Sequence, residues 1–98
     1  MPYFAALISY VPDAAERRAP YRPAHLAYLR DLHAAGKVVM AGAWSDPLDG
    51  ALIIYHTESR AEAEQLLQND PYAQAGLWTS LRLREWNVVI PPPDEPEG

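Results

Sequence analysis

The residues of this chain best suited to carry chemistry are a histidine and an aspartate. His25 lies in the segment 22–26 (RPAHL), and Leu29 and Leu32, four and seven residues later, place its imidazole at the edge of an apolar helical stripe. A histidine on a half-buried face can act as a general base near neutral pH. The alternative is a structural histidine whose ring binds a backbone carbonyl near the start of the helix.

Asp70 continues the inward stripe of a second helix, because it follows Ala63 by seven residues and Leu67 by three. A carboxylate in that position could orient the imidazole of His25, as the acid does in a base-orienter pair. Asp70 also precedes Pro71, which is typical of a residue that caps a helical turn. The two roles are compatible.

Three further residues are candidates for substrate binding. Arg22, directly ahead of Pro23, could hold an anionic group of a substrate, although a surface salt bridge is the alternative. Trp44 and Tyr72 could line an apolar pocket, and aromatic residues in such positions can equally close a core. We therefore treat Arg22, Trp44 and Tyr72 as candidate substrate-binding residues.

Several kinds of site are excluded by what the chain lacks. It has no cysteine, and its three histidines include no pair at the helical spacing of metal ligands. Its five glycines are too scattered to form a dinucleotide fingerprint or a phosphate loop. We expect a site with no metal and no cofactor.

The charge balance argues against nucleic acid as a ligand. The 98 residues carry 13 acidic and 8 basic side chains, a net charge of -5, whereas a surface that binds phosphates needs an excess of basic residues. The N-terminus has no basic region, and no window reaches the roughly 20 apolar residues that span a bilayer. We expect a cytoplasmic protein with no membrane and no nucleic-acid partner.

The order of the expected elements predicts the fold. Apolar or alternating runs predict strands, Gly36 is suited to end the first helix, and Ser59 with Glu62 forms a capping box at the start of the second. The strands are expected at 3–10, 37–44, 51–57 and 79–90, with one helix from about 23 to 36 and the other ending before Pro71. This order predicts an α+β, ferredoxin-like βαββαβ fold with an antiparallel sheet, as a single domain over residues 1–90. The proline-rich, acidic segment 91–98 is expected to be a disordered tail.

The first three strands are apolar on both faces. In the first strand, Phe4, Ala6 and Ile8 alternate with the equally apolar Ala5 and Leu7. An antiparallel sheet with one face in water should alternate apolar and polar side chains, so this sheet needs a second cover. Both helices are expected on one face, and we therefore predict a homodimer packed sheet to sheet, with an apolar space between the subunits.

The sequence resembles the YCII-related family of small bacterial proteins over residues 3 to about 90. The resemblance rests on Arg22-Pro23-Ala24-His25-Leu26, Gly36 followed by Val38-Val39-Met40-Ala41-Gly42, Asp49-Gly50, and Asn69-Asp70-Pro71-Tyr72 with Gly76. It implies a dimeric α+β barrel in which His25 and Asp70 form the active-site dyad. One branch of the family is linked to dehydrochlorination of hydroxylated aromatic rings. The chain departs from the family at Ala43-Trp44, where many relatives place a proline after the glycine, and this leaves the substrate open.

Two functions are consistent with these residues. The first is a cofactor-independent acid/base enzyme of lyase or isomerase type, acting on a small aromatic or ring-containing acid through His25 and Asp70 in an apolar dimer pocket. The second is a dimeric small-molecule-binding or accessory domain that uses the same pocket without catalysis.

Overall fold

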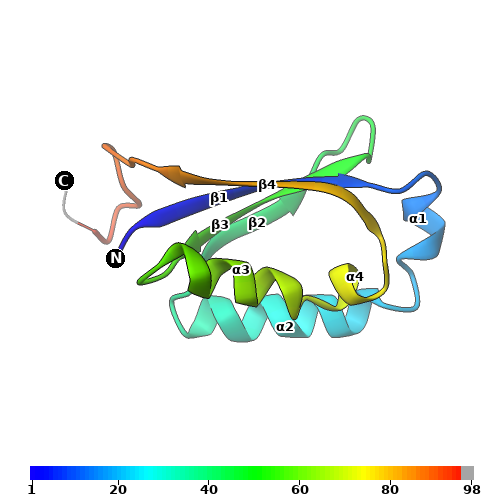
Figure 1. Ribbon diagram of the computed structural model, residues 1–98, viewed down its shortest axis with the longest axis horizontal. Coiled ribbons are helices and arrows are strands. Elements are labelled where there is room, and N and C mark those ends of the chain that lie inside the picture. Colours follow the sequence, from blue (N-terminus) through cyan, green and yellow to red (C-terminus); the bar gives the residue numbers. More distant parts are fainter. Residues whose placement is uncertain (96–98) are drawn as a thin grey trace.

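Four antiparallel strands form a single sheet in the order β2-β3-β1-β4. The computed structural model describes residues 1–95 (Figure 1). The central strands are β1 (Tyr3–Tyr10) and β3 (Gly50–His56), and the edge strands are β2 (Val38–Ala43) and β4 (Trp78–Trp86). The predicted strand order and the antiparallel sheet are therefore confirmed.

The helices lie on one side of the sheet and leave its other side open (Figure 1). The two main helices are α2 (Arg22–Ala34) and α3 (Arg60–Gln68), and α4 (Pro71–Gln74) is a single turn. The sequence did not predict α1 (Ala14–Arg17). No helix among residues 1–95 combines the length and the apolar character needed to cross a membrane. These elements complete the ferredoxin-like α+β fold predicted from the sequence.

The helix-facing side of the sheet holds the core. Phe4, Ala6 and Ile8 of β1 lie beside Tyr55, Ile53 and Ala51 of β3 in the register of the two strands, and all six are buried. Ala63 and Leu67 of α3 belong to the same apolar cluster. Because side chains alternate along a strand, the residues between them face the opposite side.

The opposite face has no helix over it (Figure 1) and is apolar in β1, β2 and β3, while β4 adds Arg82 and Arg84 beside Leu7 and Ala5. Leu7 of β1 pairs with Leu52, and Ala5 pairs with Ile54. Leu7 is 40% exposed, and the exposed fractions of Met40 and Trp86 are 64% and 50%. The predicted apolar character of both strand faces is therefore observed. The helices bury only one of these faces.

The C-terminal segment differs from the expectation. The fourth strand ends at Trp86 and not near residue 90. Residues 92–95 form a turn in which the Glu95 amide donates to the carbonyl of Pro92 at 3.0 Å. The Tyr3 hydroxyl donates to the Glu95 carboxylate, and this hydrogen bond raises the pKa of Tyr3 to about 12. Up to Glu95 the segment predicted to be a disordered tail therefore contacts the domain, and residues 96–98 lie outside the described part.

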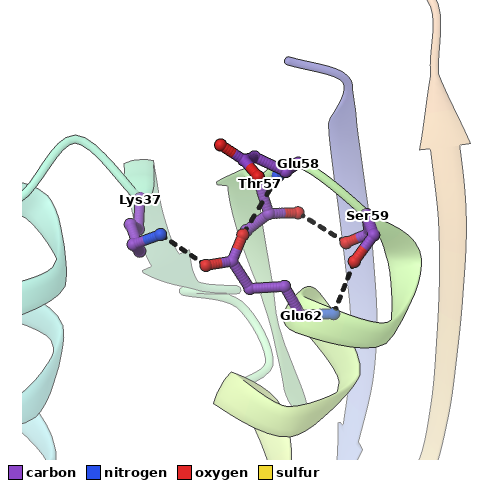
Figure 2. A network of polar contacts seen from close by, with 5 residues as sticks. All are labelled: Lys37, Thr57, Glu58, Ser59 and Glu62. Atoms are coloured by element: carbon purple, nitrogen blue, oxygen red, sulfur yellow. Dashed lines mark hydrogen bonds and ion pairs between the residues drawn. The ribbon is translucent and has the colours of Figure 1, made fainter.

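The start of α3 is fixed by a small polar network (Figure 2). The Ser59 hydroxyl accepts a hydrogen bond from the Glu62 amide at 3.1 Å, as the capping box predicts. The Glu62 carboxylate accepts from the Glu58 amide at 3.0 Å, one residue earlier than the standard box, and it also pairs with Lys37. Because Lys37 lies just before β2, this network ties α3 to the sheet.

The Lys37–Glu62 pair predicts a pH-dependent stability. The hydrogen bond from Lys37 lowers the pKa of Glu62 in the folded protein. The stabilisation is therefore present above the unfolded pKa of about 4.3 and is lost as pH falls through the lower folded value. We expect Glu62→Gln to lower the urea midpoint at pH 7 and to change it much less at pH 3. Glu64→Gln, which alters an exposed pair with Arg60, is the control, and equal effects of Glu62→Gln at both pH values would contradict the prediction.

Candidate active site

Asp70 is a fully buried carboxylate that begins α4. Its backbone is extended, Pro71 follows at the first helical position, and its Oδ1 accepts a hydrogen bond from the Tyr72 amide at 2.9 Å. This is the helix cap that Asp70-Pro71 predicts, because the side-chain oxygen satisfies an amide that the helix leaves unpaired. The cap fixes the position of the carboxylate.

His25 contacts the same oxygen. The imidazole lies in the first turns of α2 and is largely buried, and its Nδ1 is 2.7 Å from Asp70 Oδ1. A carboxylate can only accept hydrogen bonds. Nδ1 therefore carries the proton and donates a hydrogen bond to Asp70. In the neutral ring, Nε2 then has a free lone pair. Nε2 makes no hydrogen bond within residues 1–95, which leaves it available to a ligand.

Tyr72 holds the plane of the imidazole. Its ring is stacked on that of His25, with the centroids 3.6 Å apart and an angle of 7° between the planes. The edge of Tyr10 packs against Tyr72 from another side, with the centroids 6.4 Å apart. Because the Tyr72 amide also donates to Asp70, one residue fixes both members of the pair.

The charge of Asp70 acts on two buried or half-buried tyrosine hydroxyls. Burial raises the pKa of the Tyr55 hydroxyl far above its usual range, and the Asp70 charge adds to this effect. Burial also raises the pKa of Tyr28, again with a contribution from Asp70. Within the described residues, the second carboxylate oxygen, Oδ2, has no hydrogen-bond partner and His25 is the one base in ion-pair range. A proton gained by the imidazole would therefore be stabilised directly by the Asp70 charge.

His25 lines a cavity of about 370 Å³ between α2 and the helix-facing side of the sheet. The cavity lies at the end of the molecule where α1 and α4 are found (Figure 1). Arg22, Trp44 and Tyr72 line it as well, whereas Asp70 does not. Its apolar walls include Ile8, Leu26, Leu29, Ala51, Ile53 and Trp78. The volume and the mixed lining are typical of small-molecule sites.

The position of the cavity corrects one expectation. The sequence suggested an apolar dimer pocket between two sheets, but the cavity beside His25 is on the helix-covered face of a single chain. The reason is that α2 turns His25 toward the sheet that it covers. Trp44 follows the edge strand β2 and is 46% exposed, and it also borders a shallow groove with Met40, Leu52 and Ile54 on the open face.

Two cavity residues, Tyr10 and Arg18, were missed by the sequence analysis. Tyr10 is the last residue of β1 and was assigned only to the strand. Burial and the neighbouring Tyr72 raise its pKa, while Arg18 and Arg22 act in the opposite direction. Arg18 comes from the connection between α1 and α2, which carries no regular spacing that could have pointed to it.

The described residues offer no competing metal centre, because residues 1–95 contain no group of three histidine, aspartate or glutamate side chains able to hold a metal ion. The polar groups that line the cavity include the His25 imidazole, the hydroxyls of Tyr10 and Tyr72 and two guanidinium groups, and the Asp70 carboxylate contacts the imidazole from outside the cavity.

Comparison with known proteins defines the class to which this fold and cavity belong. The solved structure of 5-chloro-2-hydroxyhydroquinone dehydrochlorinase (TftG) from Burkholderia phenoliruptrix, in complex with 2,5-dihydroxybenzoquinone, superposes with a TM-score of 0.77. The two chains are 27% identical, and the match covers 87% of this chain and 93% of that one. The chain thus has the fold class of the dimeric α+β barrels.

The sequence identifies the family. The model of the YCII-related domain matches residues 2–87. Protein YciI of Escherichia coli is 33% identical over 87 residues, which cover 80% of this chain and 89% of YciI. An uncharacterised protein of Haemophilus influenzae is 26% identical over 97 residues, covering 90% of this chain and 99% of that protein. This chain belongs to the YCII-related family, as its motifs predicted.

Substitution of Asp70 tests the acceptor oxygen that its two hydrogen bonds share. Asparagine keeps an oxygen that can accept from the Tyr72 amide, and alanine keeps none. We expect Asp70→Ala to lower the free energy of unfolding by about 1–3 kcal/mol and Asp70→Asn to lower it less. Nitrogen NMR shifts should show the Nδ1-protonated form of neutral His25 in the parent and a mixture of tautomers in Asp70→Ala. A parent with the proton on Nε2, or an Asp70→Ala variant as stable as the parent, would contradict this arrangement.

Proposed function

We propose that this protein is a cofactor-independent acid/base enzyme of lyase or isomerase type that acts on a small ring-containing molecule. The observation that carries the proposal is the buried hydrogen bond between His25 Nδ1 and Asp70 Oδ1 at the wall of an apolar cavity. A base and its orienting acid need this hydrogen-bond reach.

His25 is the group that transfers the proton. With Nδ1 bound to Asp70, Nε2 removes a proton from the bound molecule and returns it to the product or to the leaving group. Asp70 keeps the ring in the correct tautomer and stabilises the imidazolium that forms. Tyr72, which is stacked on the imidazole, keeps Nε2 pointing in one direction during the proton transfer.

The solved relative supports a ring-containing substrate. TftG is a dehydrochlorinase of a hydroquinone, and its complex contains 2,5-dihydroxybenzoquinone. The apolar walls of the cavity, among them Leu26, Leu29 and Trp44, suit the faces of such a ring. The departure from the family at Ala43-Trp44 places a large indole at the cavity, so we expect a substrate different from that of TftG.

The enzyme hypothesis predicts proton transfer that depends on His25. The parent protein should catalyse chloride release from 5-chloro-2-hydroxyhydroquinone, or deuterium uptake from solvent into the ring positions of 2,5-dihydroxybenzoquinone, even if slowly. His25→Gln should reduce the rate about 100-fold or more, and Asp70→Asn should also reduce it, because general acid/base catalysis contributes on this scale. Chloride titration and proton NMR provide the measurements.

His33→Gln is the matched control, because His33 is an exposed histidine of the same helix and should retain the parent rate. Equal rates in the parent and in His25→Gln would overturn the proposed base. Binding of 2,5-dihydroxybenzoquinone without either reaction would favour the alternative, a small-molecule-binding domain with no catalysis.

We also propose that two copies pack through their open sheet faces. The support is the apolar character of that face, where Leu7 is 40% exposed and borders a shallow groove with Leu52 and Trp86. Exposed apolar patches that are rimmed by polar residues, here Arg84 and Glu85, often mark protein–protein contacts. The cavity beside His25 lies on the other face, and Trp44 borders both this cavity and a groove on the open face.

A single charge on the open face should prevent this dimer. We expect light scattering at micromolar concentration to give the parent twice the mass of the chain. Leu7→Glu should be a folded monomer, because burying a carboxylate in the contact is costly even beside its cross-strand neighbour Arg82. Leu81→Glu is the control: Leu81 is similarly exposed, at 43%, but pairs with Ile8 on the helix-facing side. A monomeric parent, or a dimeric Leu7→Glu variant, would refute the sheet-to-sheet dimer.

A further inference from the structure

The cavity has a charge opposite to that of the whole chain. The protein has a net charge of -5, but the residues that line the cavity include Arg18 and Arg22 and no aspartate or glutamate. The Asp70 carboxylate is behind His25 and fully buried. A cleft lined by one sign of charge concentrates ligands of the opposite sign, so this cavity favours an anionic ligand.

The two arginines reach the cavity from a short, ordered connection. Arg18 follows α1, and its carbonyl accepts a hydrogen bond from the Tyr21 amide at 2.9 Å, directly before α2 begins. Arg22 is the first residue of α2 and precedes His25 by three residues, a spacing that places both side chains on one face of the helix. The guanidinium groups are therefore on the same side of α2 as the proposed base.

Neither arginine has an acidic partner in the described chain. None of the ion pairs within residues 1–95 includes Arg18 or Arg22, whereas Lys37 and Arg60 are both paired with glutamates. Arg18 is half-buried, whereas Arg22 is exposed. A partly desolvated guanidinium without a counter-ion binds a carboxylate strongly, because it donates two parallel hydrogen bonds to the two oxygens.

We propose that the substrate of this protein is a carboxylate, whose anionic group binds to Arg18 and Arg22 while its ring occupies the apolar part of the cavity near His25. The inference rests on the proposed function and names its substrate class, and it makes Arg18 a specificity-determining residue.

The test compares two isosteric probes, 2,5-dihydroxybenzoate and 2,5-dihydroxybenzamide, which differ in charge and share one ring. Calorimetry should show the parent binding the benzoate about 10-fold or more tightly than the benzamide. Arg18→Met and Arg22→Met keep the aliphatic stem, and each should reduce this preference without changing the affinity for the benzamide. Arg30→Met, an exposed arginine of α2 outside the cavity, should behave as the parent.

Carboxylate binding can be tested separately from catalysis. The same titration in Asp70→Asn should retain the preference for the benzoate, because the arginines do not depend on the proton transfer. Equal affinities for both probes in the parent, no binding of either at millimolar concentration, or an unchanged preference in both arginine variants would overturn the inference. A preference for the benzoate together with no His25-dependent proton transfer would leave the inference standing and refute the proposed function.

Discussion

The burial of the Asp70 carboxylate is the constraint on which the site depends. A buried charge is costly unless hydrogen bonds satisfy it, and here one oxygen accepts from both the Tyr72 amide and His25 Nδ1. The first bond starts α4, and the second fastens α4 to α2. Removal of either partner would leave the carboxylate less well satisfied, so the local structure and the orientation of the imidazole are coupled.

The sheet divides the molecule into two functional sides. Its helix-facing side supplies the core. The same side also supplies part of the cavity wall, at Ile8, Ala51 and Ile53. Its other side has no helix over it (Figure 1), although β1, β2 and β3 also place apolar side chains there. A chain of this length has a modest core. A partner on the open face would add buried apolar area and would not occupy the cavity.

Charge illustrates how far composition can predict a binding site. The net charge of -5 argues against a broad phosphate-binding surface, but it says nothing about an individual cavity. The acidic side chains lie elsewhere on the chain, while Arg18 and Arg22 converge beside His25. Arg22 was a candidate from its position in the RPAHL segment. Arg18 was not, because only the path of the chain between α1 and α2 brings it to the same place.

The sequence by itself determined the local features: the Asp70-Pro71 cap, the serine cap of α3, the left-handed Gly36 with φ 78°, and the strand order that defines the fold. These signals depend on residues within about four positions of each other, or on alternation along one strand. Only the tertiary structure decided that His25 and Asp70, 45 residues apart, share a hydrogen bond, and that their cavity lies under the helices. The reason is that α2 and α4 meet only after both have packed, and that packing depends on the sheet as a whole.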